Sequence, residues 1–169
     1  MGAVAVVFVL GKKESETNID NEEIGDKIGT SIGDIAPDFE LTTYGGEMVR
    51  LSDHKGKSVF INFWAAWCPF CVNELPLMAE TQNKYGDQYV TLAVNRGESL
   101  ETAKMFSDNL DVIGTMIFLL NEKDDIYRRY GGFAMPYSLF LNKDGVIVDI
   151  KRGPLTREEL ESKINKILQ

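Results

Sequence analysis

The chain has 169 residues, a length suited to one ordinary domain with an additional segment. Hydrophobic residues make up 44% of the chain, so a compact core can form. The net charge is −8, and residues 12–40 carry −6 of it, because this segment holds nine acidic residues and three lysines. An acidic chain repels phosphate backbones, so we expect no nucleic-acid partner.

The chain starts with an apolar segment, GAVAVVFVL at residues 2–10, followed at once by Gly11, Lys12 and Lys13. This segment is too short to span a bilayer of about 30 Å as a helix, and no basic residues precede it as in a signal peptide. We expect residues 1–10 to be the end of a membrane anchor or export signal. Residues 11–32 are expected to form an acidic, flexible tether. A core β-strand at residues 1–10 is the alternative, because Val and Phe favour strands.

A regular alternation of strands and helices follows, so we assign residues 33–169 to one domain. Residues 39–42 and 48–51 flank a Tyr-Gly-Gly turn and predict a hairpin, and the uninterrupted apolar run 58–64 is typical of a buried strand. The other expected strands are 89–95, 115–120, 137–141 and 146–151. The other expected helices are 99–109, 123–130 and one from Thr156, where Thr156-Arg157-Glu158-Glu159 has the form of a capping box. This order predicts an α/β fold, a mixed sheet with helices on both faces.

The two cysteines of the chain, Cys68 and Cys71, are separated by only two residues. Two cysteines cannot form the disulfide framework of a small secreted domain. A structural zinc site usually needs four ligands, and the single histidine, His54, lies far away in a loop-like stretch. We therefore expect no metal, and the spacing favours redox chemistry. An inert structural disulfide and a metal half-site shared between two chains are the alternatives.

The position of the cysteines at a strand-to-helix junction indicates how they react. A helix should begin near Pro69, because proline is tolerated in the first turn, and Pro76 should kink it. The first turn offers unpaired N–H groups and about half a positive charge, which stabilise the reactive thiolate at Cys68. Cys68 would then form a mixed disulfide with a substrate, and Cys71, less exposed, would resolve it.

The run FINFWAAWCPFCVNELP at residues 60–76 resembles the active-site segment of the thioredoxin superfamily. It is most similar to the membrane-tethered, extracytoplasmic TlpA/ResA-like thiol–disulfide oxidoreductases, whose domain is of the AhpC/TSA-redoxin type. The sequences GDIAPDF at 33–39, FLNKDG at 140–145 and GPLT at 153–156 resemble the same group. The resemblance covers residues 32–168 and implies a thioredoxin fold with an N-terminal β-hairpin extension.

The resemblance also implies a substrate-binding surface around the cysteines. Pro136 matches the cis-proline that faces the two cysteines in this family; only ~5–6% of X–Pro bonds in folded proteins are cis. Met135 would pair with the substrate through its main chain. Trp67, Pro69 and Phe70 complete the expected surface.

Glu74 matches a glutamate that lies beside the cysteines in the TlpA/ResA-like group. It follows Cys71 by three residues and therefore lies on the same helix face, where a carboxylate can take the proton of Cys71. Asn62 stands where cytosolic thioredoxins carry a buried acid, so we hypothesise that Glu74 supplies the proton shuttle that Asn62 cannot. The alternative is a solvated acid that favours the helix N-terminus.

The function implied is a thiol–disulfide oxidoreductase that exchanges disulfides with protein clients, for example in cytochrome c maturation or envelope thiol repair. It needs no cofactor beyond the Cys68–Cys71 disulfide and takes electrons from a membrane or soluble thiol donor. We expect a reductant, although Pro69-Phe70 departs from the reducing branch, which more often has proline just before the second cysteine. We expect a monomer outside the cytoplasm, held to the outer face of the cytoplasmic membrane only by its N-terminal anchor; a cytoplasmic location is the alternative.

Two other functions compete with this prediction. A peroxiredoxin-like thiol peroxidase needs a hydroxyl-bearing residue three positions before its cysteine in a proline-led motif, and these places hold Ala65 and Ile61. A non-catalytic binding module of the same fold would carry a disulfide that resists reduction.

Overall fold

The computed structural model describes Gly2 and residues 27–169. The predicted anchor, apart from Gly2, and residues 11–26 of the predicted tether lie outside the described residues. Residues 27–32 of the predicted tether are described, and their main chain bonds to the domain: Ile35 N–H donates to Lys27 O at 2.7 Å, and Gly29 N–H donates to Ile35 O at 3.0 Å. No helix of the described residues is long and apolar enough to cross a bilayer.

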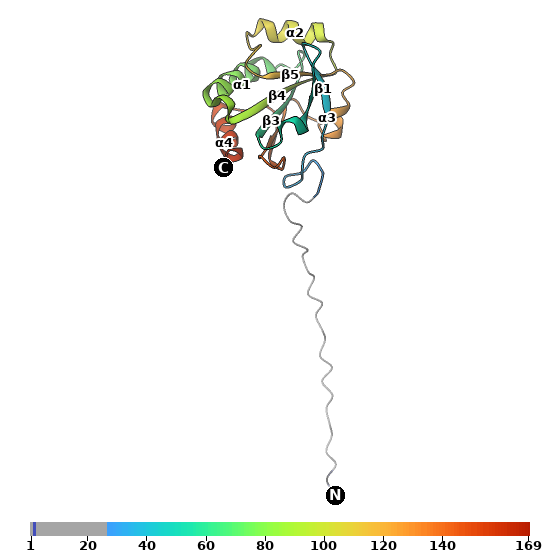
Figure 1. Ribbon diagram of the computed structural model, residues 1–169, viewed down its shortest axis with the longest axis vertical. Helices are drawn as coiled ribbons and strands as arrows, with labels where there is room; N and C mark the ends of the chain where they lie inside the picture. Colours follow the sequence, from blue (N-terminus) through green and yellow to red (C-terminus); the bar gives the residue numbers. More distant parts are fainter. Residues whose placement is uncertain (1, 3–26) are drawn as a thin grey trace.

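Seven strands form one mixed sheet in the order β2-β1-β5-β4-β3-β6-β7 (Figure 1). The parallel strands at its centre are β3 (Ser58–Trp64), β4 (Tyr89–Arg96) and β5 (Ile117–Asn121). The antiparallel strands are β1 (Glu40–Thr43), β2 (Met48–Arg50), β6 (Tyr137–Leu141) and β7 (Ile147–Arg152). The predicted N-terminal hairpin is confirmed as β1 and β2, in which Leu41 lies opposite Val49.

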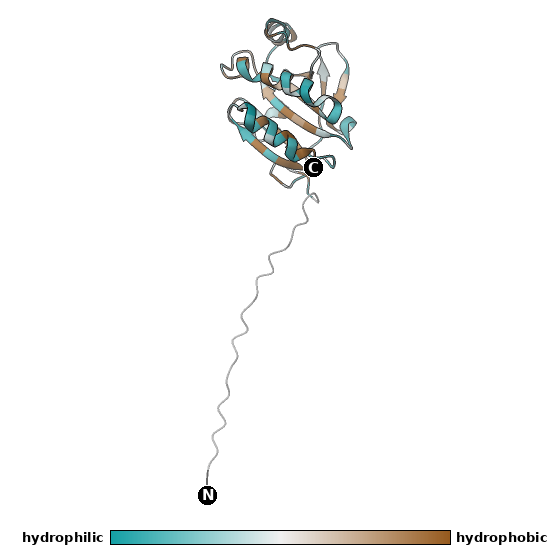
Figure 2. Ribbon diagram, turned by 90° about the vertical axis from the view of Figure 1, so that its left-hand side faces the viewer, coloured by the Kyte–Doolittle hydropathy of each residue, from teal (hydrophilic) through white to brown (hydrophobic). Residues whose placement is uncertain are grey.

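Helices cover both faces of the sheet, as predicted. They are α1 (Cys71–Tyr85), α2 (Leu100–Asn109), α3 (Asp125–Arg129) and α4 (Arg157–Ile167), with 3₁₀ turns η1 (Leu51–His54) and η2 (Gly86–Gln88). Helices α1 and α4 lie side by side against one face, where Figure 2 shows them in front of the largely hydrophobic strands. Side chains of α2 join the apolar cluster of that face, whereas those of α3 join the cluster of the other.

Strand β3 is buried along its whole length because it lies between β4 and β6 with packed side chains on both faces. Phe60 and Trp64 belong to the cluster under α1 and α4, and Ile61 and Phe63 belong to the opposite one. Since side chains alternate along a strand, Asn62 faces α1. The chain therefore places the polar side chain of Asn62 inside an apolar layer, directly below the helix that carries the second cysteine.

The last helix begins as the sequence predicts. Thr156 Oγ1 accepts a hydrogen bond from Glu159 N–H at 3.2 Å, and Glu159 Oε2 accepts one from Thr156 N–H at 3.0 Å. This capping box fixes the chain just before α4. The preceding residue, Leu155, reaches the redox site described below.

Candidate active site

The two cysteines lie where the chain leaves β3 and enters α1. They form a disulfide whose Cα atoms are 5.4 Å apart. Cys71 N–H donates to Cys68 O at 3.2 Å, so the four residues from Cys68 to Cys71 close a turn. Helix α1 therefore begins at Cys71, two residues after Pro69, near which the sequence predicts its start and which lies within this turn.

Both cysteines are buried, so the nucleophile does not project from the protein surface. Cys68 is 2% exposed and Cys71 is 1% exposed, so the expected difference between them is small. Both belong to the apolar cluster that contains Trp64. The side chains beside them point outward instead: Trp67 is 60% exposed and Phe70 is 53% exposed. The disulfide thus lies at the base of an apolar surface.

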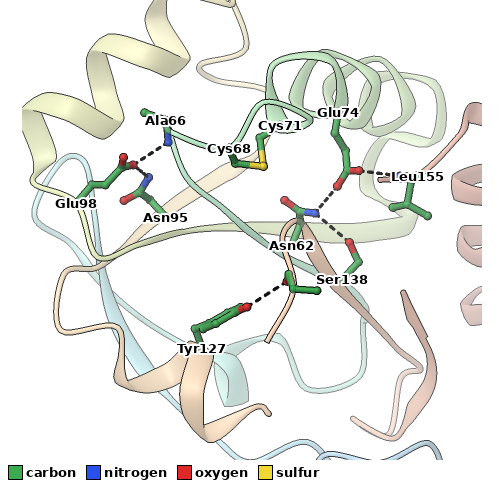
Figure 3. The surroundings of a disulfide bond; sticks show 11 residues. Asn62, Ala66, Cys68, Cys71, Glu74, Asn95, Glu98, Tyr127, Ser138 and Leu155 are labelled. Atoms are coloured by element: carbon green, nitrogen blue, oxygen red, sulfur yellow. Dashed lines mark hydrogen bonds between the residues drawn. A yellow bond between two sulfur atoms is a disulfide. The ribbon is translucent and has the colours of Figure 1, made fainter. Parts of the chain in front are cut away.

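The loop before β6 carries the cis peptide bond that the resemblance implied, between Met135 and Pro136. Pro136 is buried, and Met135 is half-buried. Strand β6 pairs with β3 so that Tyr137 lies opposite Phe63, which places this loop at the same end of the sheet as the disulfide. The hydroxyl of Tyr127 donates to Ala134 O at 3.1 Å and fixes the loop from below (Figure 3).

Glu74 is the polar group built most deeply into the site. It lies one turn after Cys71 on α1 and is 3% exposed, so the solvated alternative is wrong. Its Oε1 accepts a hydrogen bond from Asn62 Nδ2 at 2.7 Å, and its Oε2 accepts one from Leu155 N–H at 2.8 Å (Figure 3). Asn62 Nδ2 also donates to Ser138 Oγ at 2.9 Å. The amide therefore uses both of its N–H groups inside the protein.

Burial changes the acidity of this carboxyl group. Desolvation raises the pKa of Glu74 from 4.5 to about 7, and the hydrogen bonds from Leu155 and Asn62 oppose this rise. A carboxyl group with such a pKa exchanges protons near neutral pH, which an ordinary surface glutamate does not.

A second carboxylate, which the sequence did not single out for this role, holds the segment before Cys68. Glu98, in the loop after β4, accepts hydrogen bonds on Oε2 from Ala66 N–H at 2.9 Å and from Asn95 Nδ2 at 2.6 Å (Figure 3). Glu98 is 32 positions from Ala66 in the chain, so no local sequence signal indicates the contact. Glu98 thus connects the loop between β4 and α2 to the segment that precedes Cys68.

These features define a class. In the part of the chain that the structure describes, no group of three or more His, Cys, Asp or Glu side chains is arranged to hold a metal ion. A disulfide at the start of a helix, beside a cis-proline loop and on a mixed sheet covered on both faces, is the arrangement of a thioredoxin-fold redox protein.

Comparison with known proteins gives the family. The AhpC/TSA family pattern matches residues 32–150. The thioredoxin-like protein YneN of Bacillus subtilis is 36% identical over 139 residues, with 82% of each chain covered. The thiol-disulfide oxidoreductase ResA of Geobacillus kaustophilus is 34% identical over 143 residues, which are 84% of this chain and 81% of the relative. The chain belongs to the AhpC/TSA family and is a ResA-like thiol–disulfide oxidoreductase.

Solved structures share the fold. A Chlorobium tepidum protein with the provisional name thiol:disulfide interchange protein DsbE aligns with a TM-score of 0.77 and 31% identity, covering 83% of this chain and all of that one. The pneumococcal exposed lipoprotein thioredoxin Etrx1 of Streptococcus pneumoniae aligns with a TM-score of 0.67 and 32% identity, covering 77% of this chain and 99% of that one. The predicted thioredoxin fold is confirmed.

The buried Glu74 should make the oxidised protein less stable as pH rises. Its pKa of about 7 in the folded state exceeds 4.5, so the folded state holds the proton more tightly and loses stability as pH increases through this range. Relative to Glu74→Gln, the wild-type free energy of unfolding should fall by about 3 kcal/mol between roughly pH 4 and pH 8. Urea unfolding at each pH measures this difference.

Glu80→Gln is the matched control, because Glu80 is an exposed acid on the same helix. Its free energy of unfolding should follow that of the wild type across the pH range. A difference between Glu74→Gln and wild type that stays constant with pH would contradict the raised pKa.

Proposed function

We propose that this oxidoreductase reduces disulfides of protein clients outside the cytoplasm, with Cys68 as the nucleophile and Cys71 as the resolving thiol. The observation that carries the proposal is the Cys68–Cys71 disulfide at the start of α1, with exposed aromatic side chains around it. A disulfide that reacts with other proteins needs an exposed surface on which they can bind, whereas a purely structural disulfide does not.

The reaction proposed has two exchange steps. The Cys68 thiolate attacks one sulfur of a client disulfide, so that a bond forms between Cys68 and the client while the client disulfide breaks and releases a thiolate. Cys71 then loses its proton and attacks Cys68, which forms the Cys68–Cys71 disulfide and releases the second client thiolate. Two electrons pass from the protein to the client, and a thiol donor reduces the protein again by the reverse exchange.

Glu74 is the proposed acceptor of the Cys71 proton. It lies one turn along α1 from Cys71, and its pKa of about 7 suits reversible proton transfer near neutral pH. The protonated carboxyl group returns its proton when the protein is reduced again. Glu74 thereby links the redox state of the dithiol to a proton held inside the protein.

The direction proposed, reduction of clients, is supported by the surroundings of the sulfurs. A strong oxidant stabilises its reduced form by holding a thiolate. Here both cysteines are buried in an apolar cluster, which disfavours a thiolate, and the nearest charged group along α1 is the Glu74 carboxyl. The helix N-terminus acts in the opposite sense, but burial and the carboxylate favour a reductant.

The client would bind over the outward-facing side chains of Trp67, Pro69 and Phe70. The loop of Met135 and Pro136 supplies main-chain groups at the same end of the sheet. We propose no cofactor other than the redox-active disulfide. The clients proposed are proteins that need reduced cysteines, as in cytochrome c maturation or envelope thiol repair.

The location proposed is the outer face of the cytoplasmic membrane. Support comes from the apolar residues 2–10, the acidic residues that follow, and a similar solved protein that is named an exposed lipoprotein. The first described residues after the gap, from Lys27, join the domain directly.

Reduction of a protein disulfide tests the function. Reduced wild-type protein should reduce insulin, Cys68→Ser should not, and Cys71→Ser should accumulate as a mixed disulfide because the resolving step is absent. Equilibration with dithiothreitol should give a reduction potential well below the roughly −120 mV of a strong oxidant. A potential near that value would contradict the proposed direction.

Two other results would overturn the function itself. A disulfide that dithiothreitol cannot reduce, or a Cys68 that alkylating reagents do not reach in the reduced protein, would leave a binding module. Rapid turnover of peroxide with Cys68 trapped as sulfenic acid would instead identify a peroxidase.

The proton shuttle has its own test. Glu74→Gln should slow the resolution of a mixed disulfide on Cys68 by about tenfold or more and remove the dependence of this step on a group with a pKa near 7. Stopped-flow measurement between about pH 5 and pH 9, with Glu80→Gln as control, gives both quantities. Identical rates and pH profiles for Glu74→Gln and wild type would exclude the shuttle.

Labelling of intact cells tests the location. A Met105→Cys variant with both native cysteines changed to serine presents one thiol at an exposed position on α2. A membrane-impermeant maleimide should label it equally in intact and lysed cells if the domain lies outside the cytoplasm. Labelling only after lysis would place the domain in the cytoplasm.

A further inference from the structure

The most exposed large hydrophobic side chain of the described residues lies in the loop that carries the cis-proline. Phe133 is 76% exposed and lies in the loop between α3 and β6. It precedes the cis Met135–Pro136 bond by two residues. An aromatic ring held out in water at this place has much apolar area to bury when another chain binds.

An arginine side chain lies over this ring. The guanidinium carbon of Arg152, at the end of β7, is 4.8 Å from the ring centroid of Phe133 and 5.3 Å from that of Tyr137. Within the described part of the chain, Arg152 forms no ion pair with a carboxylate. A guanidinium that stacks on a ring keeps its N–H groups at its edge, where they can bind a carboxylate in bidentate fashion.

A second arginine near the site, Arg96, differs from Arg152 because it is paired with a carboxylate. Arg96 lies 3.7 Å over the ring of Tyr127 and 5.6 Å from that of Trp67. Its Nε and one terminal nitrogen bind the two oxygens of Asp124 at 2.9 Å and 2.6 Å. Arg96 is thus neutralised inside the protein, whereas Arg152 retains its charge for another partner.

The strand register places Arg152 at the end of the sheet where β3 leads into the cysteine turn, on the face shared by Phe63 and Tyr137. Tyr137 pairs with Arg152 on one side and with Phe63 on the other, and Phe63 precedes the last residue of β3. Gly153 N–H donates to Pro136 O at 2.8 Å, which ties the end of β7 to the cis-proline loop. Two strand spacings separate Arg152 from β3, or about 10 Å.

We propose that Phe133 and Arg152 form a recognition site for client segments that carry an aspartate or glutamate, next to an apolar residue, within a few residues of the reactive cysteine. An extended chain advances about 3.3 Å per residue, so about three client residues cross the two strand spacings between Arg152 and the end of β3, from which the chain continues to Cys68. The inference rests on the proposed function, because it names the class of client that the same disulfide reduces. Phe133 supplies apolar contact, and Arg152 selects for negative charge.

Matched peptides test the proposal. Each carries one cysteine in a mixed disulfide with thionitrobenzoate and differs only by Asp or Asn three residues from the cysteine. The reduced wild-type protein should release thionitrobenzoate from the Asp peptide about threefold to fivefold faster, the range of an exposed ion pair, after correction for the rate of each peptide with dithiothreitol. Arg152→Gln should lose the preference.

The control is Arg50→Gln, because Arg50 is an exposed arginine on β2 at the opposite edge of the sheet. It should keep the full preference. Phe133→Ala should slow both peptides, since it removes the apolar contact. Equal rates for the two peptides with wild type, or a preference that survives in Arg152→Gln, would overturn the proposal and leave Arg152 as a solvated cation over a ring.

Peptides that bind but cannot exchange disulfides test the recognition site separately from the proposed reduction of client disulfides. Peptides with serine in place of cysteine cannot react, and the Asp form should still bind wild type about threefold or more tightly than the Asn form. If this difference disappears in Arg152→Gln while neither thionitrobenzoate peptide reacts with any variant, the recognition site stands and the proposed reduction fails. If the serine peptides bind wild type equally, the recognition site is wrong.

Discussion

A buried carboxylate, that of Glu74, is the constraint on which the rest of the site depends. Removing a carboxylate from water is costly unless hydrogen bonds replace the lost hydration, and here they come from Asn62 on β3 and from the main chain of Leu155 before α4. Because Asn62 also donates to Ser138 on β6, one network ties α1, α4 and two neighbouring strands together. A shift of any of these elements would leave a buried polar group without a partner, so the network holds the dithiol in place.

Two opposing influences act on the stability of a thiolate at Cys68 or Cys71. The start of α1 attracts negative charge, while the apolar cluster around Cys68 and Cys71 and the nearby carboxyl group disfavour it. The ionised form of Glu74 and a thiolate on the same helix repel each other, so a proton on one favours negative charge on the other. In the proposed reaction, proton transfer from Cys71 to Glu74 therefore accompanies thiol–disulfide exchange.

Much of the fold follows from local sequence. The apolar run of β3 is specified locally, and so is the turn of residues 142–145 between β6 and β7, in which Gly145 N–H donates to Asn142 O at 3.0 Å. Burial and turn chemistry of this kind act between near neighbours. The cis-proline of the site could be predicted only from the resemblance to a known family, because sequence alone does not indicate a cis X–Pro bond. The bonds of Glu74 to Leu155 and of Glu98 to Ala66 join residues 81 and 32 positions apart, and no periodicity or spacing encodes such contacts. They arise from the way the sheet brings distant segments to one end.

The turn between the sulfurs has a consequence for how such proteins diversify. Pro69 and Phe70 are exposed, and their side chains take no part in the hydrogen bonds that hold the carboxylates. Residues of this kind tolerate exchange with little loss of stability, although they stand between the two reacting groups. Substituting these two solvent-facing residues can therefore change the surroundings of the sulfurs, and with them the redox poise of the pair, while the buried network beneath stays unchanged.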